Sequence, residues 1–192
     1  MLSVPLQHRI SIYIGSADKF RCCEPVIERS IRENTAAELD ITFMRPEALG
    51  IPLTGCTGFT NLRYAVPHLA HYRGFAIYLD VDMIVLGDIA ELYKYREAGK
   101  WVRLEDGSDE VAVISCGTHP HMPCVEDIHK HHKSALKAMT KGKNSIPLSW
   151  NVKDEVKEGM NLLHFTDLKA QPWFYEHPCK EAVQVYARYG GR

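Results

Sequence analysis

Two carboxylates, Asp80 and Asp82, stand one residue apart directly after an apolar run at residues 75–79. Five consecutive apolar residues are typical of a strand that is buried on both faces. Two ionised carboxylates at its end would lose hydration unless they were paired with arginine, capped a turn or held a cation. Hard oxygen ligands suit Mg²⁺ or Mn²⁺, and open α/β sheets bind ligands at the carboxyl ends of their strands. The pair therefore predicts a metal site that faces a substrate.

Three further side chains are candidates for the same site. His164 ends a later apolar stretch, and imidazole is a good ligand for Mn²⁺ beside two carboxylates. Lys169 follows five residues later and could contact a diphosphate as a compact positive charge. Arg63 lies in the first turn of an expected helix, where both the helix end and the guanidinium group suit phosphate. The alternatives are a structural histidine for His164 and a surface ion pair for Arg63.

The elements that must position these residues follow an alternating pattern of strands and helices, which predicts an α/β fold. Ile10, Ile12 and Ile14 alternate with more polar residues and predict a first strand that ends at residues 15–18. Pro25 suits the first turn of a helix that continues to Asn34. Further strands are expected at residues 41–44, 101–104, 111–115 and 161–165, and helices at residues 60–72, 89–97 and 128–139, with a loop over residues 46–58.

The composition restricts the class of protein. A chain of 192 residues with a net charge of −1 fits one domain, residues 1–192, with no general attraction to nucleic acid. No apolar run reaches the ~20 residues of a membrane span, and residues 1–10 lack the core of a secretory signal. The six cysteines form no C-x-x-C pair, so we expect reduced thiols in a cytoplasmic protein.

A lysine-rich segment, residues 128–150, holds five lysines and no acidic residue, with His129, His131 and His132 beside them. Such a segment is typical of a solvated helix face. The alternative is a docking site for an anionic acceptor or for a lipid headgroup. Binding of a lipid headgroup would place the protein at a membrane surface as a peripheral protein.

Read together, these residues resemble glycosyltransferase family 8, the group of glycogenin and the lipopolysaccharide galactosyltransferases. The matching segments are residues 12–18, 60–69, 76–92 and 164–173, which spread over nearly the whole chain. The block AIYLDVDMIVLGDIAEL at residues 76–92 is the most specific of them. The resemblance implies the GT-A fold, a Rossmann-type mixed sheet flanked by helices in a single compact domain.

The resemblance also implies an activity: transfer of a hexose from a nucleotide-diphosphate sugar, usually UDP-linked, to a hydroxyl of a sugar or glycoconjugate acceptor. Retention of the anomeric configuration and a Mn²⁺ or Mg²⁺ ion belong to that activity. By position, the metal ligands of the family match Asp80, Asp82 and His164. Arg63 and Lys169 match the residues that contact the diphosphate. The loop after the first strand, with Gly15, Ser16 and Asp18, matches the part that holds the nucleotide.

The chain departs from the family pattern at two places. Asp167 replaces a glycine after His164, and Lys169 comes one position early. The usual acceptor motif after the two carboxylates is absent, and residues 111–117 occupy its place. Asn151 and Trp173 are candidates for contacts with donor or acceptor hydroxyls and sugar rings, although Trp173 suits the core equally well. The residue that faces the anomeric carbon is unassigned.

Two other functions fit parts of the pattern. Phosphohydrolases of the haloacid dehalogenase type also place two carboxylates after an apolar strand, but their nucleophile lies near the start of the chain. The short chain and the altered lysine motif also suit a non-catalytic module that binds nucleotide-sugars. A sugar-nucleotide pyrophosphorylase would need a glycine-rich, arginine-containing loop near the N-terminus, which this sequence lacks.

Overall fold

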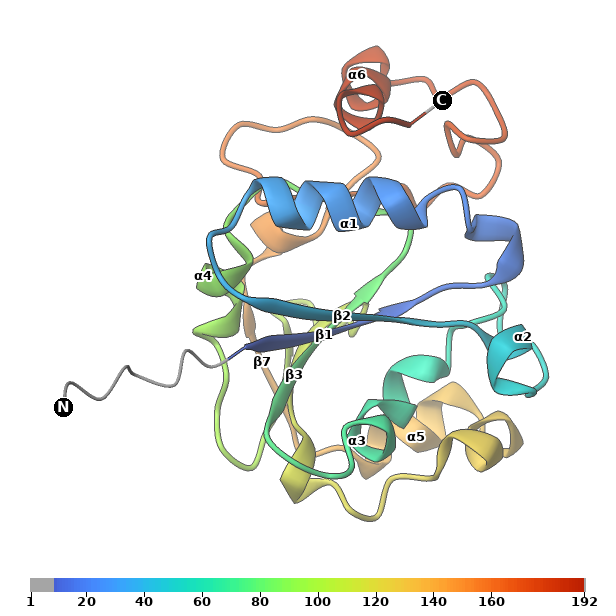
Figure 1. Ribbon diagram of the computed structural model, residues 1–192, viewed down its shortest axis with the longest axis vertical. Helices are drawn as coiled ribbons and strands as arrows, with labels where there is room; N and C mark the ends of the chain where they lie inside the picture. Colours follow the sequence, from blue (N-terminus) through green and yellow to red (C-terminus); the bar gives the residue numbers. More distant parts are fainter. Residues whose placement is uncertain (1–8, 192) are drawn as a thin grey trace, which may run out of the picture.

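A six-stranded mixed sheet forms the centre of the computed structural model, which describes residues 9–191 (Figure 1). The strand order is β2-β1-β3-β6-β5-β7. The strands are β1 (Ile10–Gly15), β2 (Leu39–Met44), β3 (Phe75–Asp80), β5 (Trp101–Leu104), β6 (Val111–Ser115) and β7 (Gly142–Ile146). β1 runs parallel to β2 and β3, whereas β6 runs antiparallel to β3 and β5. The predicted α/β class with a mixed sheet in one domain is confirmed.

The apolar run before the two carboxylates is the centre of this sheet. β3 lies between β1 and β6, and Ile77, Tyr78 and Leu79 are completely buried. In the β1–β3 register Gly15 lies opposite Asp80, and in the antiparallel β3–β6 register Leu79 lies opposite Val111. Because β1 and β3 are parallel, Asp80 and the loop after Gly15 share one edge of the sheet.

Helices cover both faces of the sheet (Figure 1). α1 (Glu24–Glu33) crosses one face, and its apolar side, including Val26, Ile27 and Ile31, is buried. α3 (Val66–Leu69) and α5 (Lys133–Met139) lie on the opposite face. The short helices α2 (Pro46–Leu49) and α4 (Ile89–Tyr93) connect strands, and α6 (Lys180–Arg188) lies beyond α1 near the C-terminus.

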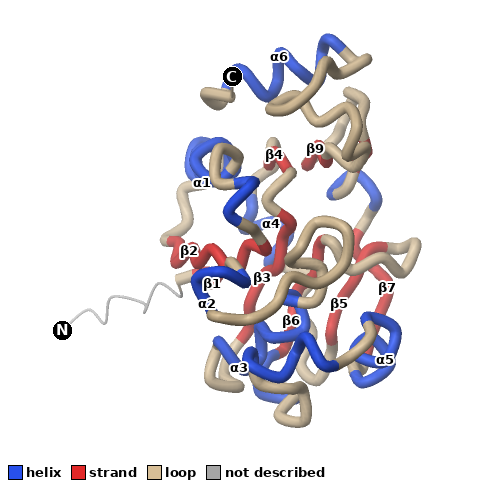
Figure 2. The backbone as a smooth tube through the Cα atoms, turned by 90° about the vertical axis from the view of Figure 1, so that its right-hand side faces the viewer, coloured by secondary structure: helices blue, strands red, loops and turns tan. Residues whose placement is uncertain are grey.

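A small second sheet connects the end of β3 to the late part of the chain. It has the order β4-β9-β8, with β4 (Met83–Val85), β8 (Val152–Lys153) and β9 (Leu162–His164). β4 and β9 pair antiparallel, so that Met83 lies opposite His164. In Figure 2 these two strands lie between the main sheet and α6. This pairing brings residues 82 and 164, far apart in sequence, to one place.

Several element boundaries differ from the sequence prediction. The expected helix at residues 60–72 is a 3-10 segment, Leu62–Ala65, followed by the short helix α3, which begins at Val66. Pro67 lies in the first turn of α3, where its missing N–H costs no helical hydrogen bond. The expected helix at residues 128–139 is likewise divided into a 3-10 segment, Val125–Lys130, and α5. The expected loop at residues 46–58 contains α2, and β7 and α6 were not predicted. β7 is a polar edge strand, so it lacks the apolar signal of a buried one.

All six cysteines carry free thiols, as expected. No helix within residues 9–191 has the length and apolar character that a membrane span requires. Residues 1–8, most of the stretch where the sequence lacks the core of a secretory signal, lie outside the described residues.

Candidate metal and donor site

Asp80, Asp82 and His164 come together at the end of β3. Each offers one ligand atom, and these three atoms all lie within 4.8 Å of one another. All three side chains are buried. The main chain fixes the arrangement, because β9 pairs with β4 and the backbone N–H of Phe165 donates to the carbonyl of Asp82 over 2.9 Å.

The bonding of Asp82 suits a bound cation. Its Oδ1 atom lies 3.2 Å from Nε2 of His164, yet it is buried and makes no hydrogen bond of acceptable geometry to the described residues. Oδ2 accepts a hydrogen bond of 3.3 Å from Nε2 of Gln171. Buried carboxylate oxygens in proteins normally have partners, so an unpartnered oxygen beside a second carboxylate and an imidazole fits Mn²⁺ or Mg²⁺.

A chain of hydrogen bonds orients His164. Its Nδ1 atom lies 2.8 Å from Oδ1 of Asn151, and Nδ2 of Asn151 donates to Oε2 of Glu110 over 3.0 Å. The Glu110 carboxylate only accepts hydrogen bonds, so it fixes the Asn151 amide with its oxygen toward His164. Nδ1 of His164 must then carry a hydrogen, which leaves Nε2 directed at Asp82 as the ligand atom of the neutral ring. Such outer contacts are typical of metal-binding histidines.

Neighbouring carboxylates alter the protonation of this group. Burial acts to lower the pKa of His164, but the charges of Asp82, Asp80 and Glu110 outweigh it and raise that pKa. Burial, reinforced by the charge of Asp82, raises the pKa of Asp80 to about 6, against the opposing effect of Arg63. Without a cation Asp80 and His164 therefore hold their protons to higher pH than usual, and a metal ion would displace those protons.

Arg63 is buried inside an ion-pair network rather than on the surface. Only 2% of its surface is exposed, and its Nη2 atom donates to both oxygens of Asp80 over 3.1 Å. Nη1 donates to Oδ1 of Asp109 over 2.8 Å, and the Tyr64 hydroxyl donates to the other oxygen of Asp109. Burial would raise the pKa of Asp109, but Arg63 and the Tyr64 hydrogen bond lower it to about 2.

A cavity of about 210 Å³ opens above these residues. Its wall includes all three candidate metal ligands and Arg63, together with Lys133 of the lysine-rich segment and Glu110, which was not among the candidates from the sequence. A signal for Glu110 exists in the sequence, because Asp109 and Glu110 directly precede the apolar run at residues 111–114. The β3–β6 register then places Glu110 next to Asp80.

The predicted nucleotide loop lies outside this cavity wall. Gly15 is packed so tightly that a Cβ atom there would lie 2.2 Å from the Tyr78 hydroxyl. Ser16 is completely buried and donates to Glu24 over 2.8 Å. Asp18 is exposed at the end of the loop. The assignment of these three residues to the nucleotide stays a prediction.

Lys169 and Trp173 also lie outside the wall of this cavity. Lys169 is exposed in the loop after β9, where the nearby Thr166 and Leu168 line the cavity instead. Trp173 packs edge-on against Phe20 and Phe165 and contacts Tyr186, which is a core environment. Their roles in binding diphosphate and sugar likewise stay predictions.

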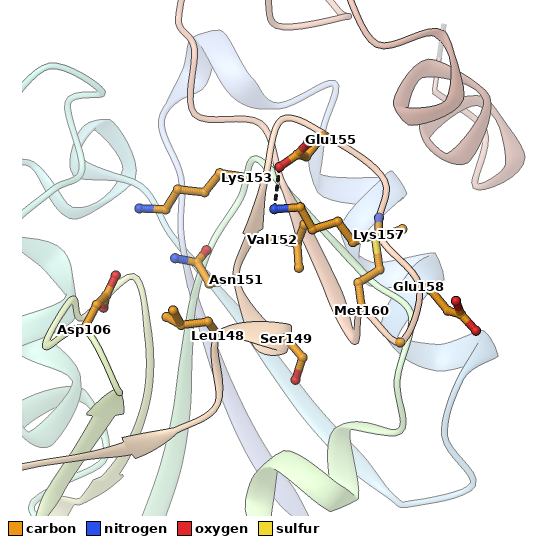
Figure 3. A pocket seen from close by; sticks show the side chains of 11 residues that line it. Asp106, Leu148, Ser149, Asn151, Val152, Lys153, Glu155, Lys157, Glu158 and Met160 are labelled. Carbon is orange, nitrogen blue, oxygen red and sulfur yellow. Dashed lines mark hydrogen bonds and ion pairs between the residues drawn. The ribbon is translucent and has the colours of Figure 1, made fainter.

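Asn151 lines a second and larger cavity of about 460 Å³ (Figure 3). Charged residues of β8 and the following loop surround it, among them Lys153, Glu155 and Lys157. Lys153 of this cavity lies 3.5 Å from Glu110 of the 210 Å³ cavity, so the walls of the two cavities are in contact. Asn151 is therefore close both to the candidate metal ligands and to a space that a sugar could occupy.

The sequence matches no protein-family model and no curated protein, but the structure is similar to solved glycosyltransferases. An active-site mutant of LgtC superposes with a TM-score of 0.64 at 10% identity, over 95% of each chain. The galactosyltransferase LgtC in complex with donor and acceptor sugar analogues gives 0.62 at 12% identity, over 94% of this chain and 95% of that one. The glycosyltransferase GlyE of Streptococcus pneumoniae TIGR4 gives 0.67 at 16% identity, over 95% of this chain and 60% of that one.

At these identities the likeness is one of fold. It agrees with the resemblance that the sequence motifs carry, and the predicted GT-A architecture is confirmed. The chain has the GT-A glycosyltransferase fold in the form found in the galactosyltransferase LgtC.

Proposed function

We propose that this protein is a metal-dependent glycosyltransferase that moves a hexose from a UDP-linked donor to a hydroxyl of a sugar or glycoconjugate, with retention. The observation that carries the proposal is the buried group of Asp80, Asp82 and His164 at the carboxyl end of β3 in a GT-A fold. The likeness to LgtC, which was crystallised with donor and acceptor sugar analogues, supports the choice of substrate class.

The three buried side chains would hold Mn²⁺ or Mg²⁺, which when bound neutralises the charge that develops on the departing diphosphate. Arg63 keeps the Asp80 carboxylate in place through its two hydrogen bonds. Lys133 lines the same cavity and supplies a second positive charge near the diphosphate. Lys169 would join it if the loop after β9 turned inward on donor binding.

Glu110 would face the sugar rather than the diphosphate, because a carboxylate repels an anion and accepts hydrogen bonds from hydroxyl groups. Burial would raise the pKa of Glu110, but His164, Lys153 and Arg63 lower it, so the group stays ionised. Asn151 and Trp173 remain the candidates for further sugar contacts. We assign Gly15, Ser16 and Asp18 to the nucleotide and, because all six thiols are free, a reducing cytoplasmic location to the protein.

Turnover of UDP-hexoses tests the proposal. With Mn²⁺ and a panel of UDP-hexoses, the protein should release UDP slowly with water and faster once a suitable acceptor is added, because bound partners react with higher effective concentration. EDTA should stop both reactions, and so should His164→Ala. His121→Ala is the matched control, since His121 is exposed and lies outside the group.

Other outcomes would point to the alternatives. Phosphate release from hexose phosphates, with none from UDP-hexoses, would indicate a phosphohydrolase. Metal-dependent binding of UDP-hexoses without turnover would indicate a binding module. Turnover that persists in EDTA would contradict the role of Asp80, Asp82 and His164.

A further inference from the structure

A separate cavity of about 430 Å³ adjoins the candidate donor site. Cys56, Thr60 and Lys133 line both this cavity and the 210 Å³ cavity above the candidate metal ligands. The remaining wall comes from the segment before α5, with His129, His131 and His132, and from the loop at residues 54–61. We call it the histidine cavity. A molecule bound there would lie directly beside a donor in the 210 Å³ cavity.

The wall of the histidine cavity is rich in hydrogen-bond donors, and the described residues that form it include no carboxylate. Three imidazoles, the Lys133 ammonium and the hydroxyls of Thr54 and Thr60 face a space large enough for a small ligand. Asp109, which lies 3.5 Å from the Lys133 ammonium, is 1% exposed and already bonded to Arg63 and Tyr64. The charge that meets a ligand in this cavity is therefore positive.

His129, which lines this cavity, has an unpartnered ring nitrogen. Its Nδ1 atom is buried and has no hydrogen-bond partner among the described residues. An unpaired buried polar atom is unfavourable, and a bound water, ion or ligand can supply the missing partner. Other polar groups nearby are engaged: the Asn61 amide donates to the His131 carbonyl over 2.9 Å, and His132 Nδ1 accepts from the backbone N–H of Ser134.

We propose that the histidine cavity binds a phosphate group carried by the acceptor. A phosphate has several strong acceptor oxygens and a negative charge, which match imidazole and ammonium donors in a wall of this composition. The acceptor hydroxyl would then lie toward Thr60 and Cys56, at the boundary with the donor cavity. The acceptor role depends on the proposed glycosyltransferase function, whereas the phosphate site itself does not.

Matched probes test the site without any need for turnover. In EDTA, isothermal titration should show that glucose 6-phosphate binds roughly tenfold or more tightly than glucose, the effect of one charge-assisted hydrogen bond. Glucose 6-phosphate should also slow alkylation of the exposed Cys56 thiol, whereas Cys22, exposed but outside both cavities, should react at an unchanged rate. Phosphatidylglycerol vesicles, compared with soluble glycerol 3-phosphate, distinguish a lipid headgroup from a soluble acceptor.

Variants separate binding from folding. His129→Leu removes the unpartnered nitrogen from its buried position. If His129 has only a structural role, the variant should be as stable as the unaltered protein or more stable, and its affinity for glucose 6-phosphate should not change. We expect the double variant His129→Leu, His131→Gln to remain folded and to lose roughly tenfold or more in affinity. His121→Gln, outside the cavity, should leave affinity unchanged.

Three outcomes would overturn the proposal. They are equal affinity for glucose and glucose 6-phosphate, unchanged affinity in the double variant, and competition of glucose 6-phosphate with UDP and Mn²⁺ for one site. Binding alongside UDP supports a separate acceptor site. If glucose 6-phosphate binds as expected but no UDP-hexose is turned over, the phosphate site is supported. The glycosyltransferase function, and with it the role of the phosphate site in binding an acceptor, would then be rejected.

Discussion

His164 and Asn151 share a hydrogen bond of 2.8 Å between Nδ1 of the imidazole and Oδ1 of the amide. Asn151 in turn donates to Glu110, so that its orientation is fixed from the far side. The sequence indicated Asn151 as a candidate for hydroxyl binding. The structure gives it a second role, in holding the imidazole of a candidate metal ligand.

Asn151→Ala should therefore weaken metal binding. It removes the acceptor that fixes the His164 ring, and loss of such an outer contact typically lowers metal affinity by about 10–100-fold. Titration of Mn²⁺ followed by electron paramagnetic resonance measures the effect. Asn144→Ala is the control, because Asn144 is exposed on the edge strand β7. Equal Mn²⁺ affinity in both variants would show that the hydrogen bond does not orient a ligand.

Metal affinity should fall as the pH is lowered. The pKa of His164 is raised in the folded protein, so the ring holds a proton at higher pH than an ordinary histidine, and Mn²⁺ must displace it. The loss of Mn²⁺ affinity should become steeper near pH 6, because the pKa of Asp80 is about 6. Each proton displaced changes the affinity about tenfold per pH unit, which Mn²⁺ titrations between roughly pH 5.5 and 8.5 would resolve.

His164→Gln supplies the control for this linkage. The glutamine variant should bind Mn²⁺ more weakly at high pH and should show a shallower dependence on pH, because one titrating ligand is absent. A slope identical to that of the unaltered protein would assign the proton to another group.

The sequence predicted the main elements of the sheet and, through the motif at residues 76–92, the fold. That success has a physical basis, because β3 and β6 are continuous apolar runs whose burial is encoded locally. The meeting of Asp82 with His164 needed more than local information. It depends on the pairing of β4 with β9, two strands of three residues each, which no periodicity reveals.

The environment of Arg63 was the least predictable part of the site. A helix-start arginine after a glycine-containing loop suggested a phosphate contact or a surface ion pair. The side chain is buried between Asp80 and Asp109, so the surface ion pair is wrong, whereas the phosphate contact stays a prediction. Asp109 stands 46 residues later in the chain, and its position follows from the β3–β6 register. Only a three-dimensional arrangement relates these two residues.

Asp109→Asn should reduce stability in a pH-dependent manner. The pKa of Asp109 falls from its usual 3.8 to about 2 on folding, which corresponds to roughly 2.5 kcal/mol at neutral pH. A carboxyl group whose pKa is lowered on folding contributes its full stabilisation of the folded state at any pH above its pKa in the unfolded chain. The contribution is lost as the pH falls through 3.8 toward about 2. Urea denaturation at several pH values should show the variant less stable at pH 7, with the difference shrinking in acid.

Asp40→Asn, on the exposed side of β2, serves as the control and should follow the unaltered protein. A stability difference between Asp109→Asn and the unaltered protein that stayed constant from neutral to acid pH would contradict the ion pair with Arg63 as its source.

Substitution of Gly15 tests whether this residue contacts the nucleotide or instead makes room for Tyr78, which bonds to the candidate metal ligand Asp80. A Cβ atom at Gly15 would lie 2.2 Å from the Tyr78 hydroxyl, which donates to Asp80 over 2.6 Å. Gly15→Ala should therefore displace Tyr78 and destabilise the protein by about 1–3 kcal/mol, as overpacking of a core typically does. Tyr78→Phe removes the clashing oxygen, so Gly15→Ala should cost less stability in that background.

Urea denaturation of the four proteins in this cycle measures the coupling between the two positions. Part of the clash will persist in the double variant, because Phe59 lies 2.9 Å from the same Cβ position. Strictly additive losses would show that the Tyr78 hydroxyl is not the group that requires glycine here. If instead Gly15→Ala left stability unchanged and weakened uridine and UDP binding alike, Gly15 would act through the nucleoside. The close packing between β1 and β3 would then have no part in holding Asp80.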